Sequence, residues 1–308
     1  MNTDREKWIL LILLSIIWGS SFILIKKSLE HFNPYQVGAL RVLIAGIILM
    51  PIAISKYKLF PKKHLKWLVL AAFTGNFIPM FLFPIAETEV SSSIAGIVNS
   101  MMPIFVIIVG ALVWKFGTTR RQIMGTFISF TGVCVLAFGG DAESGTFKLI
   151  PILLLLLATL CYAVSTTTVK SKLMDISSTV LSAFVFTFVL LLPSVIALTF
   201  TGFFSTFSFD KDHLTGLMFV SLLSIFGTGL AMMMNYRLLK VSSPLFASTV
   251  TLLMPIVAIT EILGGLLVLL PKTRAVGALV MLPIIIGILA HHFHHDPAGI
   301  VSGLVFAV

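Results

Sequence analysis

The stretch "SSSIAGIVNSMMPIF" (residues 91–105) is apolar along most of its length, yet it carries a proline, Pro103. A second stretch, "SSPLFASTVTLLMPIV" (residues 242–257), has the same Met-Pro-Ile sequence around Pro255. A proline in a helix interior removes a backbone hydrogen-bond donor and costs about 3 kcal/mol. Because the chain accepts this cost twice, the two stretches indicate an internal repeat with a bend in each copy.

The composition is typical of a membrane protein. Of the 308 residues, 58% are apolar and 11% are charged, whereas soluble domains have roughly 25% charged residues. The mean hydropathy is +1.08, and runs of about 20 apolar residues are long enough to cross a hydrocarbon layer of about 30 Å. We therefore expect an all-α membrane protein with ten transmembrane helices. The expected spans are about 8–26, 35–55, 66–86, 91–114, 121–139, 149–169, 178–200, 214–236, 244–270 and 273–290.

The net charge of +9 is unevenly distributed between the loops. With a cytoplasmic N-terminus, fourteen Lys and Arg residues fall on the inner side and six on the outer side. The inner residues are Arg5, Lys7, Lys56, Lys58, Lys62, Lys63, Lys66, Lys115, Arg120, Arg121, Lys170, Lys172, Arg237 and Lys240. This asymmetry follows the positive-inside rule and places both termini in the cytoplasm. The basic residues are thus topology signals, and we expect no nucleic-acid partner.

Comparison of the chain with itself indicates two halves. At an offset of 152, Gly75 aligns with Gly227, and Met102-Pro103-Ile104 aligns with Met254-Pro255-Ile256. Each half holds five spans, so the second half would enter the membrane from the opposite side. We expect one five-helix repeat in residues 1–140 and an inverted one in 141–290, followed by a His-rich tail (291–308) without assigned function. Inverted repeats are typical of secondary transporters, which bind substrate between the halves near the bilayer midplane.

The stretch "WGSSFILIKKSLEHFNPYQVGALRVLIAGIILMPIA" (residues 18–53) resembles the opening of ten-helix EamA-type members of the drug/metabolite transporter superfamily. Residues 18–22 match a Trp-Gly-Ser-x-Phe-like element in the first helix of that family, and Arg41 matches an arginine in its second. Pro103 and Pro255 match prolines in its fourth and ninth helices. The resemblance covers about residues 8–290. The family often has a glutamate just after the fourth and ninth helices, but this chain has none in "VWKFGTTRR" (113–121) or "LLVLLPKTR" (266–274).

The resemblance implies a secondary transporter that exports small organic metabolites, such as amino acids or amphipathic compounds, across a bacterial inner membrane by alternating access. It also implies that the first, third, fourth, sixth, eighth and ninth helices line a central cavity. No nucleotide-binding loop of the G-x-x-x-x-G-K-[ST] type is present in the sequence, which argues against direct use of ATP. A channel-like pore and a membrane scaffold without transport activity stay open as alternatives.

The two prolines and the polar residues at membrane depth are the candidate site. Each proline would leave a backbone carbonyl about four residues earlier, at Asn99 and Thr251, open to a substrate, and Pro103 and Pro255 would act as gates. Polar groups inside spans are costly unless they face protein or water. The predicted substrate-binding residues are Trp18, Ser21, Asn76, Phe77, Asn99, Tyr162, Thr166, Thr228 and Thr251, with Ser165, Asn235 and the methionines 232–234 as further candidates.

Charged residues within the spans are few. Arg41 is expected to extend to the interface, to form a structural ion pair or to attract an anionic group, and Glu261 is its candidate partner or a proton carrier. Glu87 and Glu89 are expected at the solvated outer mouth.

The sequence offers no sign of enzymatic chemistry. Cys134 and Cys161 lie within predicted spans, with no metal-ligand spacing, and no histidine falls inside a predicted span. We therefore expect no enzyme activity, no cofactor and no metal. The expected partners are a small-molecule substrate and the lipid bilayer, with the protein a monomer or homodimer.

Overall fold

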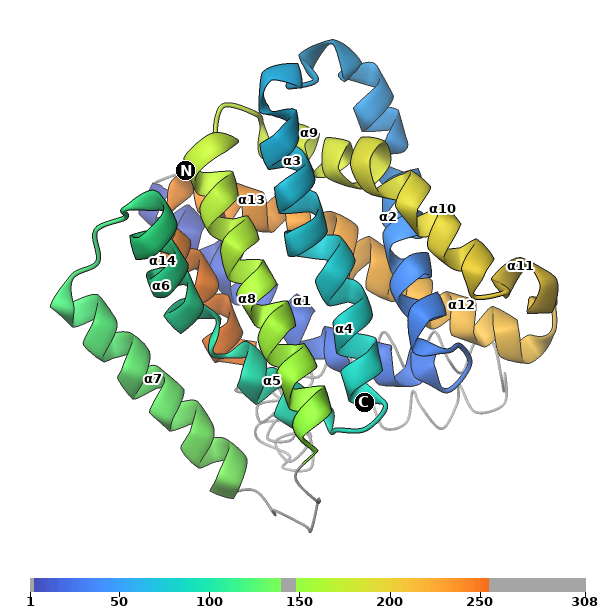
Figure 1. Ribbon diagram of the computed structural model, residues 1–308, viewed down its shortest axis with the longest axis horizontal. Helices are drawn as coiled ribbons and strands as arrows, with labels where there is room; N and C mark the ends of the chain where they lie inside the picture. Colours follow the sequence, from blue (N-terminus) through green and yellow to red (C-terminus); the bar gives the residue numbers. More distant parts are fainter. Residues whose placement is uncertain (1–2, 140–147, 255–308) are drawn as a thin grey trace, which may run out of the picture. The chain divides into compact units, whose positions relative to one another are not determined.

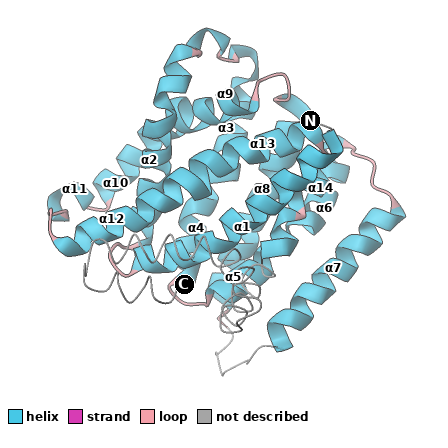
Figure 2. Cartoon of the chain, turned by 180° about the vertical axis from the view of Figure 1, so that it is seen from behind, coloured by secondary structure: helices cyan, strands magenta, loops and turns pink. Residues whose placement is uncertain are grey.

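In the computed structural model, residues 3–139 and 148–254 are described, and they form helices joined by turns and short loops (Figure 1). Figure 2 shows the same described residues from behind, where no strand interrupts the helices. The bounds are α1 Thr3–Leu29, α2 Pro34–Ser55, η1 Tyr57–Leu59, η2 Lys62–His64, α3 Leu65–Ala72, η3 Phe73–Phe77, α4 Ile78–Glu87, α5 Ser92–Asn99, α6 Met102–Trp114, α7 Arg120–Gly139, α8 Leu149–Lys172, α9 Ser178–Ala183, η4 Phe184–Leu190, α10 Leu191–Phe200, α11 Phe203–Thr206, α12 Lys211–Ser224, η5 Ile225–Leu230, α13 Ala231–Val241 and α14 Pro244–Ser248.

Seven helical segments in the described part are long and apolar enough to cross a membrane. They are Thr3–Leu29, Pro34–Ser55, Lys62–Glu87, Ser92–Trp114, Leu149–Lys172, Ser178–Phe200 and Lys211–Val241. Each coincides with a predicted span. Lys211–Val241 is longer than the eighth predicted span, 214–236. The fifth predicted span coincides with α7, and the ninth begins in the shorter apolar helix Pro244–Met254. The tenth, 273–290, lies outside the described residues. The chain is thus a multi-pass membrane protein whose described residues form helices without strands.

Polar side chains cap the helices where they begin. Asn33 forms a capping box with Gln36 at the start of α2, and Pro34 occupies the first turn, where its missing N–H is not needed. Ser91 Oγ accepts from Ile94 N before α5, and Ser243 Oγ accepts from Phe246 N before α14. Ser91 and Ser243 are separated by the repeat offset of 152, so the two capped starts are equivalent positions.

Three spans contain a wider, π-helical turn. These turns are η3 in the third span, η4 in the seventh and η5 in the eighth. A π-helical turn inserts an extra residue into the helix and is often found at functional sites. Residues 73–77 and 225–229 are again related by the offset of 152, so the third and eighth spans share this distortion.

The fourth span is interrupted, which corrects the predicted position of Pro103. The sequence suggested a proline inside one continuous helix, whereas α5 ends at Asn99 and α6 begins at Met102 after a two-residue turn. Pro103 therefore lies in the first helical turn, where its lack of an N–H costs little. A similar turn interrupts the helix after Ser248, at Thr249. Pro255 lies outside the described residues.

Buried apolar side chains pack the interior of the bundle, and other apolar side chains lie on its surface. Leu14, Leu68, Leu155 and Phe184 are fully buried in the main core. In contrast, large apolar side chains on the outward faces are exposed, as expected for helices in contact with lipid. Examples are Ile47, Leu112, Ile128, Leu192 and Phe200.

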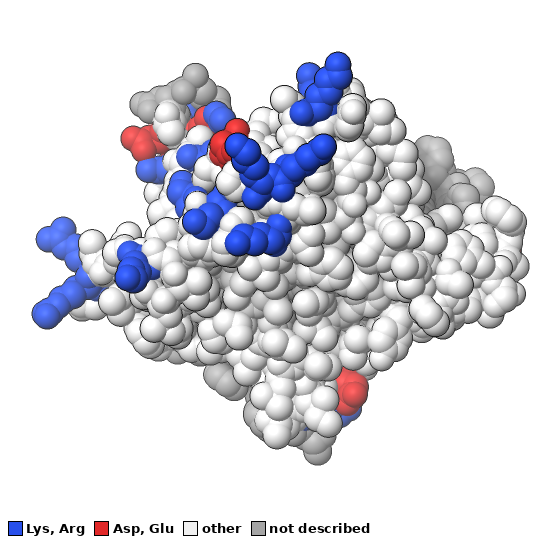
Figure 3. Space-filling view, turned by 45° about the horizontal axis from the view of Figure 1, so that its top comes forward, with Lys and Arg blue, Asp and Glu red and all other residues white. Residues whose placement is uncertain are grey.

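Lys and Arg gather over one end of the described helices (Figure 3). This end holds the start of α1 and the loop with η1 and η2, which contains Lys56, Lys58, Lys62 and Lys63. A one-sided basic surface fits the loop asymmetry seen in the sequence.

Candidate functional site

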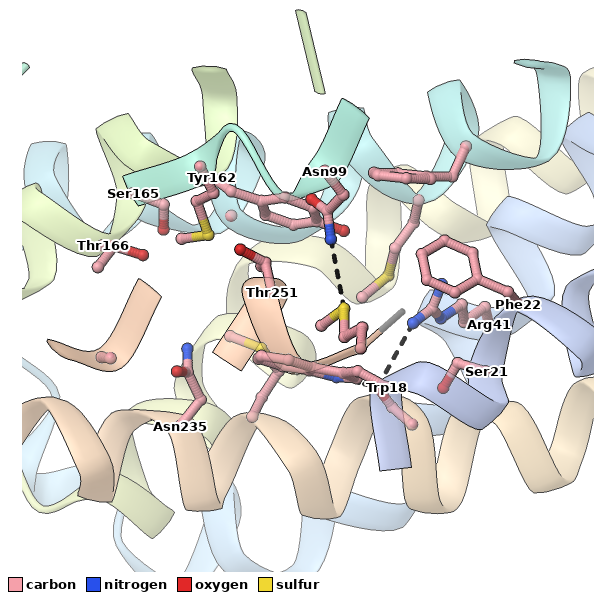
Figure 4. Close-up of a pocket in the computed structure, with 18 of the residues that line it drawn as sticks. Trp18, Ser21, Phe22, Arg41, Asn99, Tyr162, Ser165, Thr166, Asn235 and Thr251 are labelled. Atoms are coloured by element: carbon pink, nitrogen blue, oxygen red, sulfur yellow. Dashed lines mark hydrogen bonds between the residues drawn. The ribbon is translucent and has the colours of Figure 1, made fainter. Parts of the chain in front are cut away.

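A cavity of ≈ 80 Å³ lies among helices from both halves of the chain (Figure 4). A water-sized sphere needs roughly 10–15 Å³ by this measure, so the cavity has room for several waters or a compact solute. It is lined by Trp18, Ser21, Phe22, Ile25, Arg41, Gly75, Met80, Phe83, Asn99, Met102, Tyr162, Ser165, Thr166, Gly227, Met232, Asn235, Tyr236, Ala247, Thr251 and Met254. The lining is mostly apolar and aromatic with a few polar groups, which is typical of small-molecule sites.

The polar side chains lie at different places along the cavity. Figure 4 shows Arg41, Phe22 and Ser21 at one end and Ser165, Thr166 and Asn235 at the other. Trp18, Asn99, Tyr162 and Thr251 lie between the two ends. A ligand lying along the cavity would therefore meet a cation at one end, aromatic rings in the middle and hydroxyl and amide groups at the other end.

The wall formed by α1 and η5 depends on a close contact at Gly227. Trp18 Nε1 donates to the Gly227 carbonyl oxygen at 2.9 Å, which holds the indole ring against the cavity. A methyl group added to Gly227 would lie 2.6 Å from Ser21 Oγ, well inside van der Waals contact. The glycine therefore lets α1 approach the π-helical turn closely enough for the Trp18 hydrogen bond.

The opposite wall, formed by α8 and η3, repeats this arrangement. Ser165 Oγ donates to the Ala71 carbonyl oxygen at 2.9 Å, and a methyl group on Gly75 would lie 2.1 Å from Ser165 Oγ. Gly75 and Gly227 are equivalent in the repeat, and Ser165 lies in the first span of the second half as Ser21 does in the first. A serine thus packs on a glycine in a π-helical turn on both sides of the cavity.

Arg41 is buried, with 6% of its surface exposed. Its Nε donates to Thr228 Oγ1 at 2.7 Å, and its Nη2 donates to the Gly227 carbonyl oxygen at 3.4 Å. The predicted extension to the interface is therefore wrong, because these acceptors in η5 hold the guanidinium inside the bundle. Within the described part of the chain, no carboxylate lies within 4.0 Å of it, so the predicted ion pair is not formed there. Glu261 lies outside that part.

The helix interruption brings Asn99 to the cavity. Its Nδ2 contacts Met254 Sδ at 3.5 Å, and its Oδ1 is buried without a hydrogen-bond donor among the described residues. Thr251, from the ninth span, donates to the Ser248 carbonyl oxygen at 2.9 Å. Asn99 therefore leaves an acceptor available at the centre of the cavity, where fourth-span and ninth-span residues meet.

Several predicted residues lie together in the lining, and others lie behind it. Those in the lining are Trp18, Ser21, Arg41, Asn99, Tyr162, Thr166 and Thr251. Asn76 is fully buried and faces the Tyr236 side chain. Phe77 packs between Phe73 and Phe81. Thr228 lies behind the lining and accepts the hydrogen bond from Arg41. Pro103 follows the lining residue Met102 at the start of α6, while Pro255 and Glu261 lie outside the described residues.

Sequence reasoning missed Tyr236 and Phe83. Tyr236 is four residues after the lining residue Met232, so both lie on one face of α13, and this spacing was the available signal. Phe83 stacks on Tyr162 with ring centroids 5.9 Å apart, but nothing in its sequence context distinguishes it from other phenylalanines in the spans.

Glu87 is not at a solvated rim. Its side chain is fully buried, its Oε2 accepts from Ser92 Oγ at 3.0 Å, and its Oε1 has no hydrogen-bond partner among the described residues. Lys26 Nζ donates to the Glu87 backbone carbonyl rather than to the carboxyl group. Glu89, two residues later, is exposed and lies 3.4 Å from Lys148 Nζ, as a rim residue should. The end of α4 packs under Ser92 and Lys26, which is why only Glu89 reaches solvent.

The described lining of the cavity includes no His, Cys, Asp or Glu side chain. Among the described residues, no three His, Cys, Asp or Glu side chains cluster in a way that would hold a metal ion. Cys161 is a buried free thiol next to Tyr162.

Comparisons with known proteins agree with this architecture. Residues 6–138 match the EamA-like transporter family. An uncharacterized transporter of Archaeoglobus fulgidus is 32% identical over 54% of this chain and 59% of its own length. The uncharacterized transporter YdfC of Bacillus subtilis is 32% identical over 46% of each chain. The chain thus spans about half the length of these two relatives.

Longer matches are more distant. The uncharacterized inner membrane transporter YedA of Escherichia coli is 28% identical over 80% of this chain and 78% of its own. One solved crystal structure aligns with 98% of this chain and 94% of its own chain, with a TM-score of 0.57 and 14% identity, and shares the fold. The predicted resemblance is therefore supported: residues 6–138 are similar to the EamA-like transporter family, and the relatives named here are described as transporters.

Proposed function

We propose that the protein is a secondary transporter that moves small organic metabolites, such as amino acids or amphipathic compounds, by alternating access. In this proposal ten transmembrane helices form two inverted five-helix repeats, residues 1–140 and 141–290. Both termini face the cytoplasm of a bacterial inner membrane, export is the favoured direction, and the protein acts as a monomer or homodimer. It is not an enzyme.

The single observation that carries the proposal is the cavity between interrupted helices. Asn99 and Thr251 come from the fourth and ninth spans, and both meet at the cavity close to a break in the helix. Discontinuous helices at the interface of two repeats are typical of substrate sites in secondary transporters. A site between interrupted helices of two repeats fits a carrier that alternates its access better than it fits an open pore.

Paired features support the inverted repeat. The caps Ser91 and Ser243 and the π-helical turns at 73–77 and 225–229 recur at the offset of 152, and each serine–glycine contact joins a serine of one half to a glycine of the other. Local structure of this kind would not recur at one sequence offset in unrelated halves. The basic end of the helix bundle supports cytoplasmic termini, since it contains loops that the proposed topology places inside (Figure 3).

Two carboxyl groups are candidates for coupling transport to a proton gradient. Glu261 was selected from the sequence, and Glu87 is added by its complete burial and its unpartnered Oε1. Ionisable groups buried at membrane depth are rare and often belong to proton relays. Facilitated diffusion or exchange without protons is the alternative mode.

Transport by purified protein in liposomes tests the proposal. A panel of radiolabelled amino acids is applied with and without an imposed pH gradient, using Asn99→Ala and Tyr162→Phe as site variants. Tyr35→Phe is a matched control, because Tyr35 is an exposed residue outside the cavity. We expect saturable flux and counterflow for one class of solute, lost in the site variants and kept in the control.

Two outcomes would contradict the carrier. Flux that rises linearly with concentration and shows no counterflow would indicate a channel-like pore. No solute-specific flux in protein that melts cooperatively would favour a scaffold role.

A further inference from the structure

Arg41 is the one charged side chain in the described lining of the cavity. The twenty lining residues include no Asp or Glu, and their other polar groups are hydroxyls, amides and an indole. A cavity with a buried cation and no buried anion has a positive potential, because protein around it screens charge far less than water does. The cavity therefore favours solutes that carry a negative group.

Within the described part of the chain, Arg41 hydrogen-bonds to uncharged groups and forms no ion pair. Its two acceptors, Thr228 Oγ1 and the Gly227 carbonyl oxygen, are neutral. A buried charge without an opposite charge is costly, even when dipoles hydrogen-bond to it. Nε and Nη2 are the guanidinium nitrogens that hydrogen-bond within the described residues, which leaves Nη1 for a ligand. An incoming anion would supply both the missing charge and the missing acceptor.

Among the described residues, the carboxyl group that acts on Arg41 is hydrogen-bonded to another side chain. Glu87 is the acidic side chain that interacts electrostatically with Arg41, but it is beyond ion-pair distance, and Ser92 hydrogen-bonds to its Oε2. Lys26 lies beside the Glu87 backbone carbonyl, which adds a further cation at this end of the helices. Glu87 therefore leaves the guanidinium available to a ligand.

The groups around Arg41 suit a carboxylate attached to an apolar body. The Tyr162 side chain lies within electrostatic reach of Arg41 and lines the cavity, so its hydroxyl can donate to the same anion. Trp18, Phe22, Phe83 and the lining methionines supply apolar walls. Phe22 lies at the Arg41 end, and Trp18 lies between the two ends (Figure 4). Guanidinium groups bind carboxylates through paired N–H donors, which orients the ligand as well as holding it.

We propose that the transported solutes are small organic carboxylates, bound with the carboxylate at Arg41 and an apolar body along Trp18 and Phe83. This inference rests on the proposed function and names the chemical class of its substrate. The cavity of ≈ 80 Å³ restricts the body to a few carbon atoms or one ring. Organic amines of the same shape are excluded, since they would place a second cation beside Arg41.

Binding to the purified full-length protein in detergent tests this assignment. The probes are two series matched in shape: isovalerate, isovaleramide and isopentylamine, and 3-phenylpropionate, 3-phenylpropanamide and 3-phenylpropylamine. Dissociation constants are measured by titration calorimetry. A charge-assisted hydrogen bond is worth about 1.5–3 kcal/mol, so we expect the carboxylates to bind about 10- to 100-fold more tightly than their amides. The amines should not bind.

The variants separate ligand recognition from folding. Arg41→Gln should bring carboxylate and amide to equal affinity, whereas Arg41→Lys should keep part of the preference because it keeps the charge. Arg237→Gln makes the same chemical change at an exposed ion pair with Glu6 and should leave the preference unchanged. A purely structural role of Arg41 would weaken all probes equally and would leave their ratio as in the wild type.

The same probes distinguish failure of the inference from failure of the proposed function. Carboxylate-selective binding without flux in liposomes would contradict the transporter function but support the Arg41 binding site. Saturable flux of solutes without any carboxylate preference would contradict the Arg41 assignment but support the transporter function. Equal binding of carboxylate and amide, or no binding of either series, also contradicts the assignment.

Discussion

Arg41 Nε donates a 2.7 Å hydrogen bond to Thr228 Oγ1, joining the second span to the π-helical turn of the eighth. The same threonine hydroxyl lies 3.3 Å from the Leu223 carbonyl oxygen, five residues earlier, and can donate to it. Thr228 thus links the guanidinium to the widened turn itself. A regular helix at this point would rotate the residues after the turn, so the distortion sets the position of Arg41 in the cavity.

Replacing Thr228 tests the contribution of this link. Thr228→Val keeps the shape of the side chain but removes the acceptor of a buried charged group, which costs about 1–3 kcal/mol. Thr228→Ser keeps the hydroxyl and should melt close to the wild type. Melting temperature in detergent is the measurement, and equal melting of the valine and serine variants would show that Arg41 gains nothing from the bond.

The two serine–glycine contacts give a second prediction. Gly227→Ala places a methyl group 2.6 Å from Ser21 Oγ and 3.6 Å from Ser21 Cβ. The alanine variant should therefore be destabilised. Adding Ser21→Ala should restore most of the stability, because Ser21 Oγ is the one neighbour inside 3.0 Å, while Leu223 Cδ1 at 3.2 Å is the end of a flexible side chain. Gly75→Ala should behave differently, since its methyl group would also lie 2.8 Å from Ser165 Cβ. Its rescue requires Ser165→Gly, and Ser165→Ala should not suffice.

A matched glycine checks this interpretation. Gly125 lies in α7 with no atom within 4 Å of an added methyl group. Gly125→Ala should be neutral or stabilising by up to about 1 kcal/mol, because alanine favours the helix. Loss of stability in all three alanine variants would mean that helix flexibility, and not close packing, explains these glycines. Thermal melting of the single and double variants decides between the two.

Apolar runs predicted where the helices lie, but they did not predict which faces of the helices meet. Spans such as Ser92–Trp114 are apolar nearly all round, so the side that faces the cavity is decided by packing with distant helices. Polar residues at membrane depth were the better guide, and Asn99, Tyr162 and Thr251 were found in this way. Phe83 and Met102 could not be found, since an apolar lining residue looks the same as one that faces lipid.

Local backbone changes explain the remaining differences. Pro103 was expected inside a helix, because hydropathy continues unbroken through the turn at residues 100–101. Asn76 was expected in the cavity, but the π-helical turn places Gly75 in the lining and Asn76 behind it. The sequence shows a glycine and an asparagine side by side without indicating an extra residue in that turn. The repeat stays a prediction, which rests on glycines and prolines that recur at one offset.

The start of α12 gives a prediction on pH. Hydrogen bonds from Ser208 and from the side chain and backbone of His213 hold the pKa of Asp210 well below its usual range. A lowered pKa in the folded state means that Asp210 stabilises the fold above the unfolded pKa of 3.8 and that this contribution is lost as the pH falls toward the folded pKa. Asp210→Asn should keep the cap on His213 N while removing this pH dependence. Melting curves of both proteins from neutral to acidic pH should therefore converge at the acidic end, and a constant difference would contradict the prediction.

Glu87 and Glu89 form a natural pair for testing the coupling of transport to protons. Glu87 is buried with its Oε1 unpartnered, and Ser92, Lys26 and Arg41 are the polar and charged groups that act on it in the described part of the chain. Glu89 is exposed beside Lys148, two residues along the chain. Glu87→Gln keeps the shape of the side chain but cannot exchange a proton, so uptake should lose its response to an imposed pH gradient. Glu89→Gln should retain that response, because a solvated carboxylate of this kind is not part of a buried relay.

The outcome also decides between the two carboxyl groups proposed for coupling. The response is measured as the ratio of initial uptake rates with and without the gradient in the same liposomes, so a change in protein amount cancels. A response kept in Glu87→Gln and lost in Glu261→Gln would assign coupling to the ninth span. A wild-type protein whose uptake ignores the gradient would leave Glu87 without a coupling role. Its burial would then serve the packing of α4 against Ser92 and the end of α1, and carboxylate exchange would be the transport mode to test.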